Sequence, residues 1–187
     1  MGGGGRGGVP GRGRHILPAL ALALALVLSG CGKEAESDGT GVPGDTLETA
    51  FFSFTVESVR QTEAFAGKTA PRGCGYLTVE VTVRNTTEDE VEMYDTDFSV
   101  QWGSGPSDYG YPVTTDSETG EALDTASAGQ LPAAYTLAAE EERTGTLVFL
   151  VPADADQLSL TCQEAFADGT AGDTFTVDLL EEPAAEK

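Results

Sequence analysis

The sequence has little positive charge and almost no histidine. It contains 10 lysine and arginine residues against 31 aspartate and glutamate residues, and its one histidine, His15, lies near the start. Three of the arginines also precede residue 31, so from there onward seven basic residues remain against 31 acidic ones, a formal charge of −24. A field of that sign repels phosphate backbones, which argues against nucleic acid as a partner. Either the charge attracts cationic partners or metal ions, or it only keeps the protein soluble.

The lack of histidine also restricts the chemistry that the chain could perform. A serine nucleophile needs a neighbouring base, and only Lys33, Lys68 and Lys187 remain for that role, none of them in a recognisable motif. A zinc site built on cysteine thiolates would lack the histidine that commonly completes it. We therefore expect no catalytic residues, no enzyme activity and no cofactor.

Long apolar runs are absent except for one, residues 16–30. Arg6, Arg12 and Arg14 precede this run and no acid does, which is the anatomy of a signal peptide. About 15 apolar residues make a helix of about 22 Å, which is short for a hydrocarbon core of about 30 Å. A permanent membrane span is therefore the weaker alternative.

The apolar run ends in Leu28-Ser29-Gly30-Cys31, which resembles the lipobox of bacterial lipoproteins. The resemblance implies a diacylglycerol on the Cys31 thiol, removal of residues 1–30, and acylation of the new amino group. Two or three acyl chains make an anchor that does not readily dissociate. We expect a protein held by lipid on the outer face of a bacterial membrane, the alternative being a cysteine that merely follows a secretory signal.

Cysteine is scarce, and lipidation of Cys31 would leave only Cys74 and Cys162. Thiols outside the cytoplasm are in a compartment that is not reducing, so an even pair predicts a disulfide between Cys74 and Cys162. Two buried free thiols are the alternative.

Apolar residues beyond residue 50 alternate with period two rather than at helical spacing, which predicts strands with one buried face. The alternating sets are Phe52, Phe54, Val56; Leu77, Val79, Val81, Val83; Phe98, Val100, Trp102; Leu147, Phe149, Val151; Leu158, Leu160, Cys162; and Phe175, Val177, Leu179. Weaker strands at 109–114 and 135–137 bring the number to seven or eight. The fold class is therefore all-β, a two-sheet antiparallel sandwich of immunoglobulin-like type.

The flanking segments have little to bury. Residues 31–49 are polar and rich in glycine, which predicts a lipidated cysteine on a flexible linker, and residues 181–187 are expected to form a disordered tail. The sandwich should then span residues 50–180. Residues 103–132 form a long irregular stretch, which is either a binding surface or an unstructured insertion.

Three sequence runs resemble a known family. Residues 75–85 (GYLTVEVTVRN), 97–100 (DFSV) and 145–152 (GTLVFLVP) are similar to the bacterial telokin-like lipoprotein domain of unknown function. The resemblance covers about residues 51–180 and implies an immunoglobulin-like sandwich on a lipid anchor, with no catalytic motif. The sequence departs from the family at 138–140, where a Pro-Gly turn is common, and in the length of 103–132.

The densest acidic cluster lies between residues 88 and 97. Calcium takes six to eight oxygen ligands, so Asp89, Glu90, Asp95 and Asp97 are weak candidates for a metal site. The spacing is not that of an EF-hand loop, and a solvated connection between strands explains the cluster without a metal.

These features predict a membrane-anchored extracytoplasmic lipoprotein whose sandwich is a non-catalytic binding module for an envelope protein, a peptide or a small ligand. The alternative is a structural spacer or accessory envelope domain without its own ligand. An exposed patch of Tyr109, Tyr111 and Tyr135 would favour binding, whereas a uniformly acidic surface would favour the spacer. The oligomeric state is left open.

Overall fold

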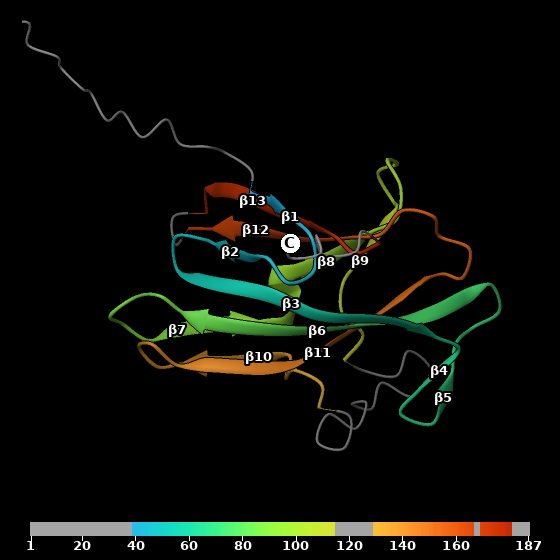
Figure 1. The fold of residues 1–187 in the computed structure, drawn as a ribbon, viewed down its shortest axis with the longest axis horizontal. Coiled ribbons are helices and arrows are strands. Elements are labelled where there is room, and N and C mark those ends of the chain that lie inside the picture. The colour runs from blue at the N-terminus through green and yellow to red at the C-terminus, as the bar shows by residue number, and fades with distance from the viewer. Residues whose placement is uncertain (1–38, 115–128, 167–168, 181–187) are drawn as a thin grey trace, which may run out of the picture. The chain divides into compact units, whose positions relative to one another are not determined.

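The computed structural model describes residues 39–114, 129–166 and 169–180. Within these ranges the chain is almost entirely β-structure with one short 3-10 helix, η1, at Asp95–Asp97 (Figure 1). The strands are β1 (Thr40–Gly41), β2 (Thr46–Glu48), β3 (Phe52–Thr62), β4 (Ala64–Phe65), β5 (Lys68–Thr69), β6 (Cys74–Asn85), β7 (Val91–Tyr94), β8 (Phe98–Gln101), β9 (Tyr109–Gly110), β10 (Ala134–Leu137), β11 (Glu142–Pro152), β12 (Ser159–Ala165) and β13 (Ala171–Asp178).

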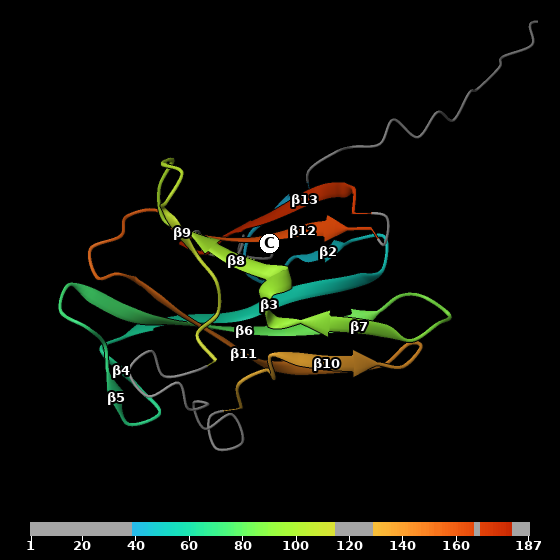
Figure 2. The ribbon, with the colours of Figure 1, turned by 180° about the vertical axis from the view of Figure 1, so that it is seen from behind.

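Two main sheets face each other across one core (Figure 2). Sheet A has the strand order β1-β13-β12-β8-β9, and sheet B has the order β11-β6-β3-β2. Two small ribbons, β10-β7 and β4-β5, complete the described strands. Every pair is antiparallel except β1–β13. The predicted all-β sandwich of two antiparallel sheets is therefore confirmed.

Alternation of side chains explains why β6 is the central strand of sheet B. Leu77, Val79, Val81 and Val83 are buried, and the residues between them point to the opposite face. β6 pairs with β11 over its whole length, and with β3 from Tyr76 to Asn85 around a bulge in β3, so most of its backbone groups have partners. Inward valines and leucines on a strand that is paired on both sides form the base of the core.

Phenylalanine rings join the two sheets across the core. The ring of Phe54 on β3 meets that of Phe98 on β8 edge to face, with centroids 5.4 Å apart and planes at 78°. Phe52 contacts the same Phe98 ring at 6.3 Å and 62°. Such pairs stabilise a core by about 0.5–1.5 kcal/mol beyond the area they bury. They fix the start of β3 opposite β8, which positions the cleft described below.

The sandwich begins earlier than the sequence predicts. The linker predicted for residues 31–49 was wrong for its second part, because β1 pairs in parallel with β13 and β2 pairs with β3. The turn between them is closed by Asp45, whose Oδ2 accepts the Val42 N–H at 3.0 Å. These strands are joined through backbone bonds and expose most of their side chains, so no apolar alternation marks them. Cys31 and the predicted tail 181–187 lie outside the described residues.

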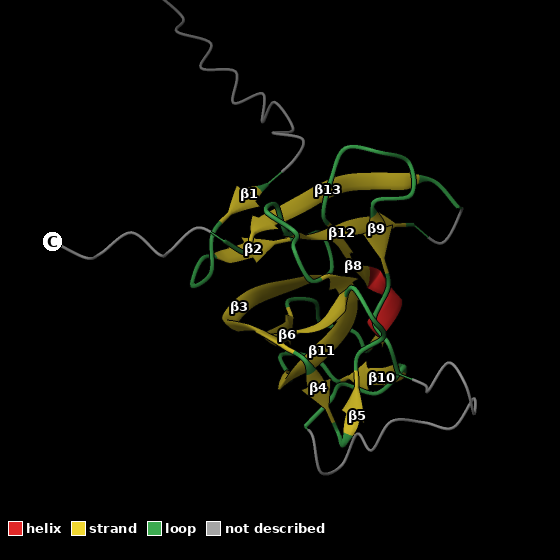
Figure 3. Cartoon of the chain, turned by 90° about the vertical axis from the view of Figure 1, so that its right-hand side faces the viewer, coloured by secondary structure: helices red, strands yellow, loops and turns green. Residues whose placement is uncertain are grey.

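The described ends of the long 103–132 stretch cover the outer edge of β11. The backbone of Thr146 accepts from the Leu131 N–H and donates to the Gly129 carbonyl oxygen, both at 2.9 Å, and Val113 donates to the carbonyl oxygen of Val148 at 2.6 Å. An unpaired edge of eleven residues would be open to pairing with another chain. The described ends of this stretch therefore cover the middle of that edge, at Thr146 and Val148. In Figure 3 the strands of sheet B follow one another as β3, β6 and β11.

Candidate binding cleft

A cleft of about 490 Å³ opens beside β7, between that strand, the end of β12 and the start of β3. Five consecutive residues, 90–94, take part in its lining. Successive side chains of a strand point to opposite faces, so this consecutive run means that β7 meets the cleft with its edge. The lining residues are Phe51, Phe52, Glu90, Val91, Glu92, Met93, Tyr94, Asp97, Cys162, Gln163, Glu164 and Ala165.

The edge of β7 that faces the cleft has no strand partner in the described part of the chain, where β7 pairs only with β10. The Asp95 N–H donates to the Ala133 carbonyl oxygen at 3.1 Å, which extends that ladder by one pair. Bonded and non-bonded pairs alternate in an antiparallel ladder, so the backbone groups of Glu92 and Tyr94 point away from β10. The Tyr94 N–H donates to the Asp97 carboxylate at 2.8 Å. The Glu92 N–H and C=O and the Tyr94 C=O remain available at this edge.

One rim of the cleft is held in place by Asn85, which is fully buried at the end of β6. Its Nδ2 donates to the carbonyl oxygens of Asp89 at 2.7 Å, Leu137 at 3.1 Å and Ala138 at 3.1 Å. Its Oδ1 accepts from the N–H and the hydroxyl of Thr87, at 2.8 and 2.9 Å. Asn85 therefore folds the loop 86–90 against the β10–β11 turn and fixes the approach to β7.

The floor of the cleft is apolar. Phe51, Phe52, Met93 and Cys162 contribute to it, and Phe51 packs edge to face against the half-exposed ring of Phe166 at 5.6 Å. Burial raises the pKa of the Cys162 thiol to about 12, helped by the nearby carboxylates of Asp97 and Glu164. A thiol in that state is neutral and poorly nucleophilic, so it serves as part of an apolar surface.

The rim of the cleft carries four carboxylates and no lysine or arginine. Glu164 is buried and structural, since it accepts the N–H of Ala50 at 2.6 Å and of Asp173 at 3.1 Å. Asp97 caps the Tyr94 N–H, and burial raises its pKa. The two carboxylates on the β7 side, Glu90 and Glu92, are exposed, and a hydrogen bond with the Glu92 carboxylate raises the pKa of Tyr94. The cleft therefore has a negative rim around an apolar floor.

The structure does not gather the four weak metal candidates into a ligand set. Asp89 and Glu90 are exposed, Asp97 caps the backbone of β7, and Asp95 is buried with only 4% of its surface exposed. Burial raises the pKa of Asp95, and its Oδ2 has no hydrogen-bond partner. Among the residues described, no three histidine, cysteine, aspartate or glutamate side chains are placed to hold a metal ion.

The predicted disulfide was wrong, because Cys74 and Cys162 are both free. Cys74 begins β6, and Cys162 lines the cleft together with Phe52, which pairs with Asn85 at the other end of β6. The two ends of β6, a strand of 12 residues, are eleven steps apart, about 36 Å at about 3.3 Å per residue. A disulfide needs Cα atoms within about 7 Å, so counting cysteines without their positions was misleading.

Two of the three tyrosines proposed as a patch are together on the surface. Tyr109 and Tyr111 are about half exposed, and their rings stand perpendicular with centroids 5.8 Å apart. Tyr135 is buried beneath the guanidinium of Arg143, which lies 5.0 Å from its ring centroid. The predicted patch is thus reduced to a pair, and sequence reasoning missed the cleft.

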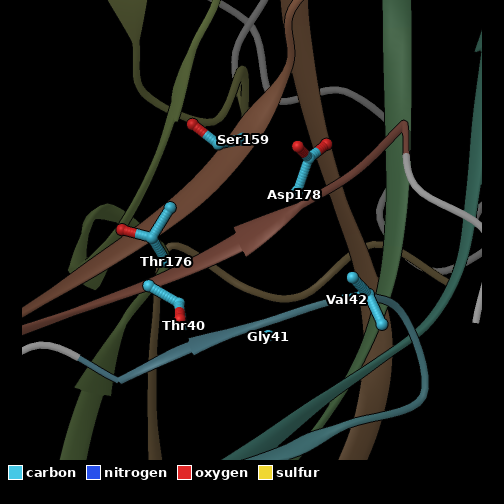
Figure 4. A pocket seen from close by; sticks show the side chains of 6 residues that line it. All are labelled: Thr40, Gly41, Val42, Ser159, Thr176 and Asp178. Carbon is cyan, nitrogen blue, oxygen red and sulfur yellow. The ribbon is translucent and has the colours of Figure 1, made fainter.

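A second depression lies over the strands β1, β13 and β12 (Figure 4). It is lined by the small or polar residues Thr40, Gly41, Val42, Ser159, Thr176 and Asp178. Its hydroxyls and single carboxylate offer no apolar anchor, unlike the cleft at β7, and its edge strand β1 has only two residues.

Comparison with known proteins shows which family and which solved structures this chain is similar to. The profile of the DUF4352 family, a domain of unknown function, matches residues 43–172. A Bacillus subtilis protein, ycdA, described as a "putative lipoprotein", has 21% identity and a TM-score of 0.51, and the match covers 73% of this chain but only 39% of that protein. The yjhA protein of the same organism has 17% identity and a TM-score of 0.50 over 74% of this chain and 98% of its own. No curated protein matches. At these identities the two structures show the fold alone.

Proposed function

Because this chain belongs to the DUF4352 family, whose function is unknown, its function has to be inferred from its own residues. We propose that it is a lipid-anchored envelope protein with a non-catalytic binding module, which takes a protein or peptide ligand in the cleft beside β7. The observation behind the proposal is the combination, in one place, of an apolar floor, a negative rim and an unpaired strand edge. Ligand sites share this concave, apolar character with a few placed polar groups.

The lipid anchor is supported by the sequence, in which the apolar run 16–30 ends at Cys31. Gly39, the first described residue, lies eight positions after Cys31, a stretch that can span at most about 29 Å. Gly39 lies against Phe175, which pairs with Cys162 in the cleft lining. A lipid on Cys31 would therefore hold Gly39 within about 29 Å of the lipid. No helix in the described ranges is long and apolar enough to cross a membrane.

A non-catalytic role is supported by the groups in the cleft. Its one thiol, Cys162, is buried with a raised pKa, and no histidine follows His15 in the sequence. The carboxylates of Asp97 and Glu164 are occupied with backbone N–H groups. Binding is the property that this arrangement supports best.

Metabolic labelling with an alkyne analogue of palmitate tests the anchor. We expect label on the wild-type protein and on Cys74→Ser, and none on Cys31→Ser. Label that persists in Cys31→Ser would contradict the anchor.

Photocrosslinking in intact cells tests the binding module. A photoreactive amino acid at Tyr94, in the cleft, should give a discrete crosslinked species, and the same group at Glu80, on the exposed face of β6, should not. Equal or absent crosslinking at both positions would support the spacer role instead.

A further inference from the structure

We propose that the ligand of the cleft is an extended peptide segment bearing lysine or arginine side chains, which adds as a further strand to the free edge of β7. This inference rests on the binding function proposed above and names the partner of the same cleft. It follows from three features: the unpaired backbone groups of β7, the acidic rim of the cleft, and the lack of an equally suitable edge on the other described strands.

The backbone supplies the first argument. The Glu92 N–H and C=O and the Tyr94 C=O point away from β10 and into the cleft. An incoming antiparallel strand would exchange two bonds with Glu92 and donate one to Tyr94, as peptides do when they extend an exposed sheet edge. The four residues of β7 present about 13 Å of edge, enough for a segment of about four residues.

The charge of the rim selects the side chains. Glu90 and Glu92 are exposed and lie next to the unpaired backbone groups, and the lining of the cleft contains no basic residue. A segment with basic side chains facing this rim would form ion pairs, and an acidic one would be repelled. Side chains of an added strand alternate, so its other face would place apolar groups on the floor formed by Phe51 and Cys162.

The other edges of the described sheets are less suited to a basic strand. β11 is covered at Thr146 and Val148 by residues 129–131 and by Val113, and β1, β2 and β9 have only two or three residues each. β2 pairs only with Ser53–Thr55 of β3, so the end of β3 is also open, but it carries Arg60 and lies outside the cleft. β7 is therefore the edge that combines four unshared residues with a cleft of apolar floor and acidic rim.

The probe for this proposal is a fluorescein-labelled peptide of alternating lysine and valine, about six residues long. Fluorescence anisotropy measures its binding to the full-length protein in non-ionic detergent. We expect saturable binding that weakens as salt rises from about 50 to about 500 mM. Two control peptides are an alternating glutamate and valine peptide, and a lysine and valine peptide N-methylated at alternate residues. The glutamate peptide has negative instead of positive side chains, and the N-methylated peptide lacks backbone N–H donors. We therefore expect neither control to bind.

Substitutions separate the backbone from the charge. Glu92→Pro removes the outward N–H without breaking the β7–β10 ladder, and should weaken peptide binding about fivefold or more. Glu92→Gln removes only the charge and should weaken it about twofold to threefold. Glu48→Pro is the matched control, since Glu48 is also an exposed glutamate with an outward N–H on an edge strand. It should bind like the wild type.

Several outcomes would overturn the inference. Equal binding of the basic and acidic peptides refutes the charge argument, and undiminished binding of the N-methylated peptide refutes strand addition even if Glu92→Pro fails to fold. Absence of peptide binding despite a crosslinked partner at Tyr94 would refute this inference and leave the proposed function intact. Absence of both would refute the two together.

Discussion

Replacing Asn85 with alanine should destabilise the protein strongly, although Asn85 is polar and is not part of the hydrophobic core cluster. Its side chain is fully buried and makes five hydrogen bonds to the backbone or hydroxyl of four residues on two loops. A net hydrogen bond contributes about 1 kcal/mol, and a buried carbonyl left unpaired costs about 1–3 kcal/mol. The Leu137 carbonyl bond is buried, and the other bonds are partly buried. We expect a loss of about 3–4 kcal/mol in the free energy of unfolding.

Urea unfolding followed by tryptophan fluorescence measures this loss. With a slope of about 2 kcal/mol/M, the midpoint for Asn85→Ala should fall by about 1.5–2 M at unchanged slope. Thr86→Ala is the control, since Thr86 is exposed and its hydroxyl has no partner in the described structure. Thr87→Ala should lose about 1 kcal/mol and should be non-additive with Asn85→Ala, because the two side chains bond to each other. A midpoint shift below about 0.5 M would refute the role given to Asn85.

Three further predictions concern the interior and the cysteines. Burial raises the pKa of Asp95 above its ordinary value of 3.8, so the folded protein binds this proton at higher pH than the unfolded chain. Stability should therefore rise as pH falls through the raised pKa toward 3.8. Asp95→Asn should abolish this part of the rise, as thermal unfolding measured at several pH values can check. Gly145→Ala should lower the free energy of unfolding by about 1–3 kcal/mol, because the new Cβ would lie 2.7 Å from the Leu131 side chain. Calorimetry would measure this loss, and an unchanged stability would contradict the close packing of Leu131 against β11. Thiol titration of denatured, unreduced protein should find both Cys74 and Cys162 free, and a blocked pair would contradict the structure.

Alternation of apolar residues predicted the main strands, because a strand with one buried face has an apolar residue at every second position. β6 and β11 are examples, since Val81 and Phe149 lie where the alternation places inward residues. β1 and β2 have no such alternation, because they are held by backbone pairing with β13 and β3 and their side chains are not buried. The turn at 138–140 keeps its shape without glycine, since Glu140 adopts a φ of 63° there.

The cleft could not be predicted from the sequence because its parts come from three separate segments. Phe51, Tyr94 and Glu164 lie far apart in the chain and meet only through the packing of β3 and β12 and the placement of β7. A free strand edge has no sequence signature, since it depends on which strands fail to become neighbours. The acidic run from 88 to 97 was visible, but its carboxylates have different roles: Asp97 caps an N–H, Asp95 is buried and Glu92 is exposed.

The acidic edge of β7 also bears on how copies of this chain behave when crowded together. Two molecules meeting at this edge would bring the carboxylates of Glu90 and Glu92 against those of the second molecule. Like charges placed opposite each other destabilise a strand pair. The carboxylates that would attract a basic strand therefore also disfavour pairing between two copies of this chain. The unpaired backbone groups of β7 then remain free for a different partner.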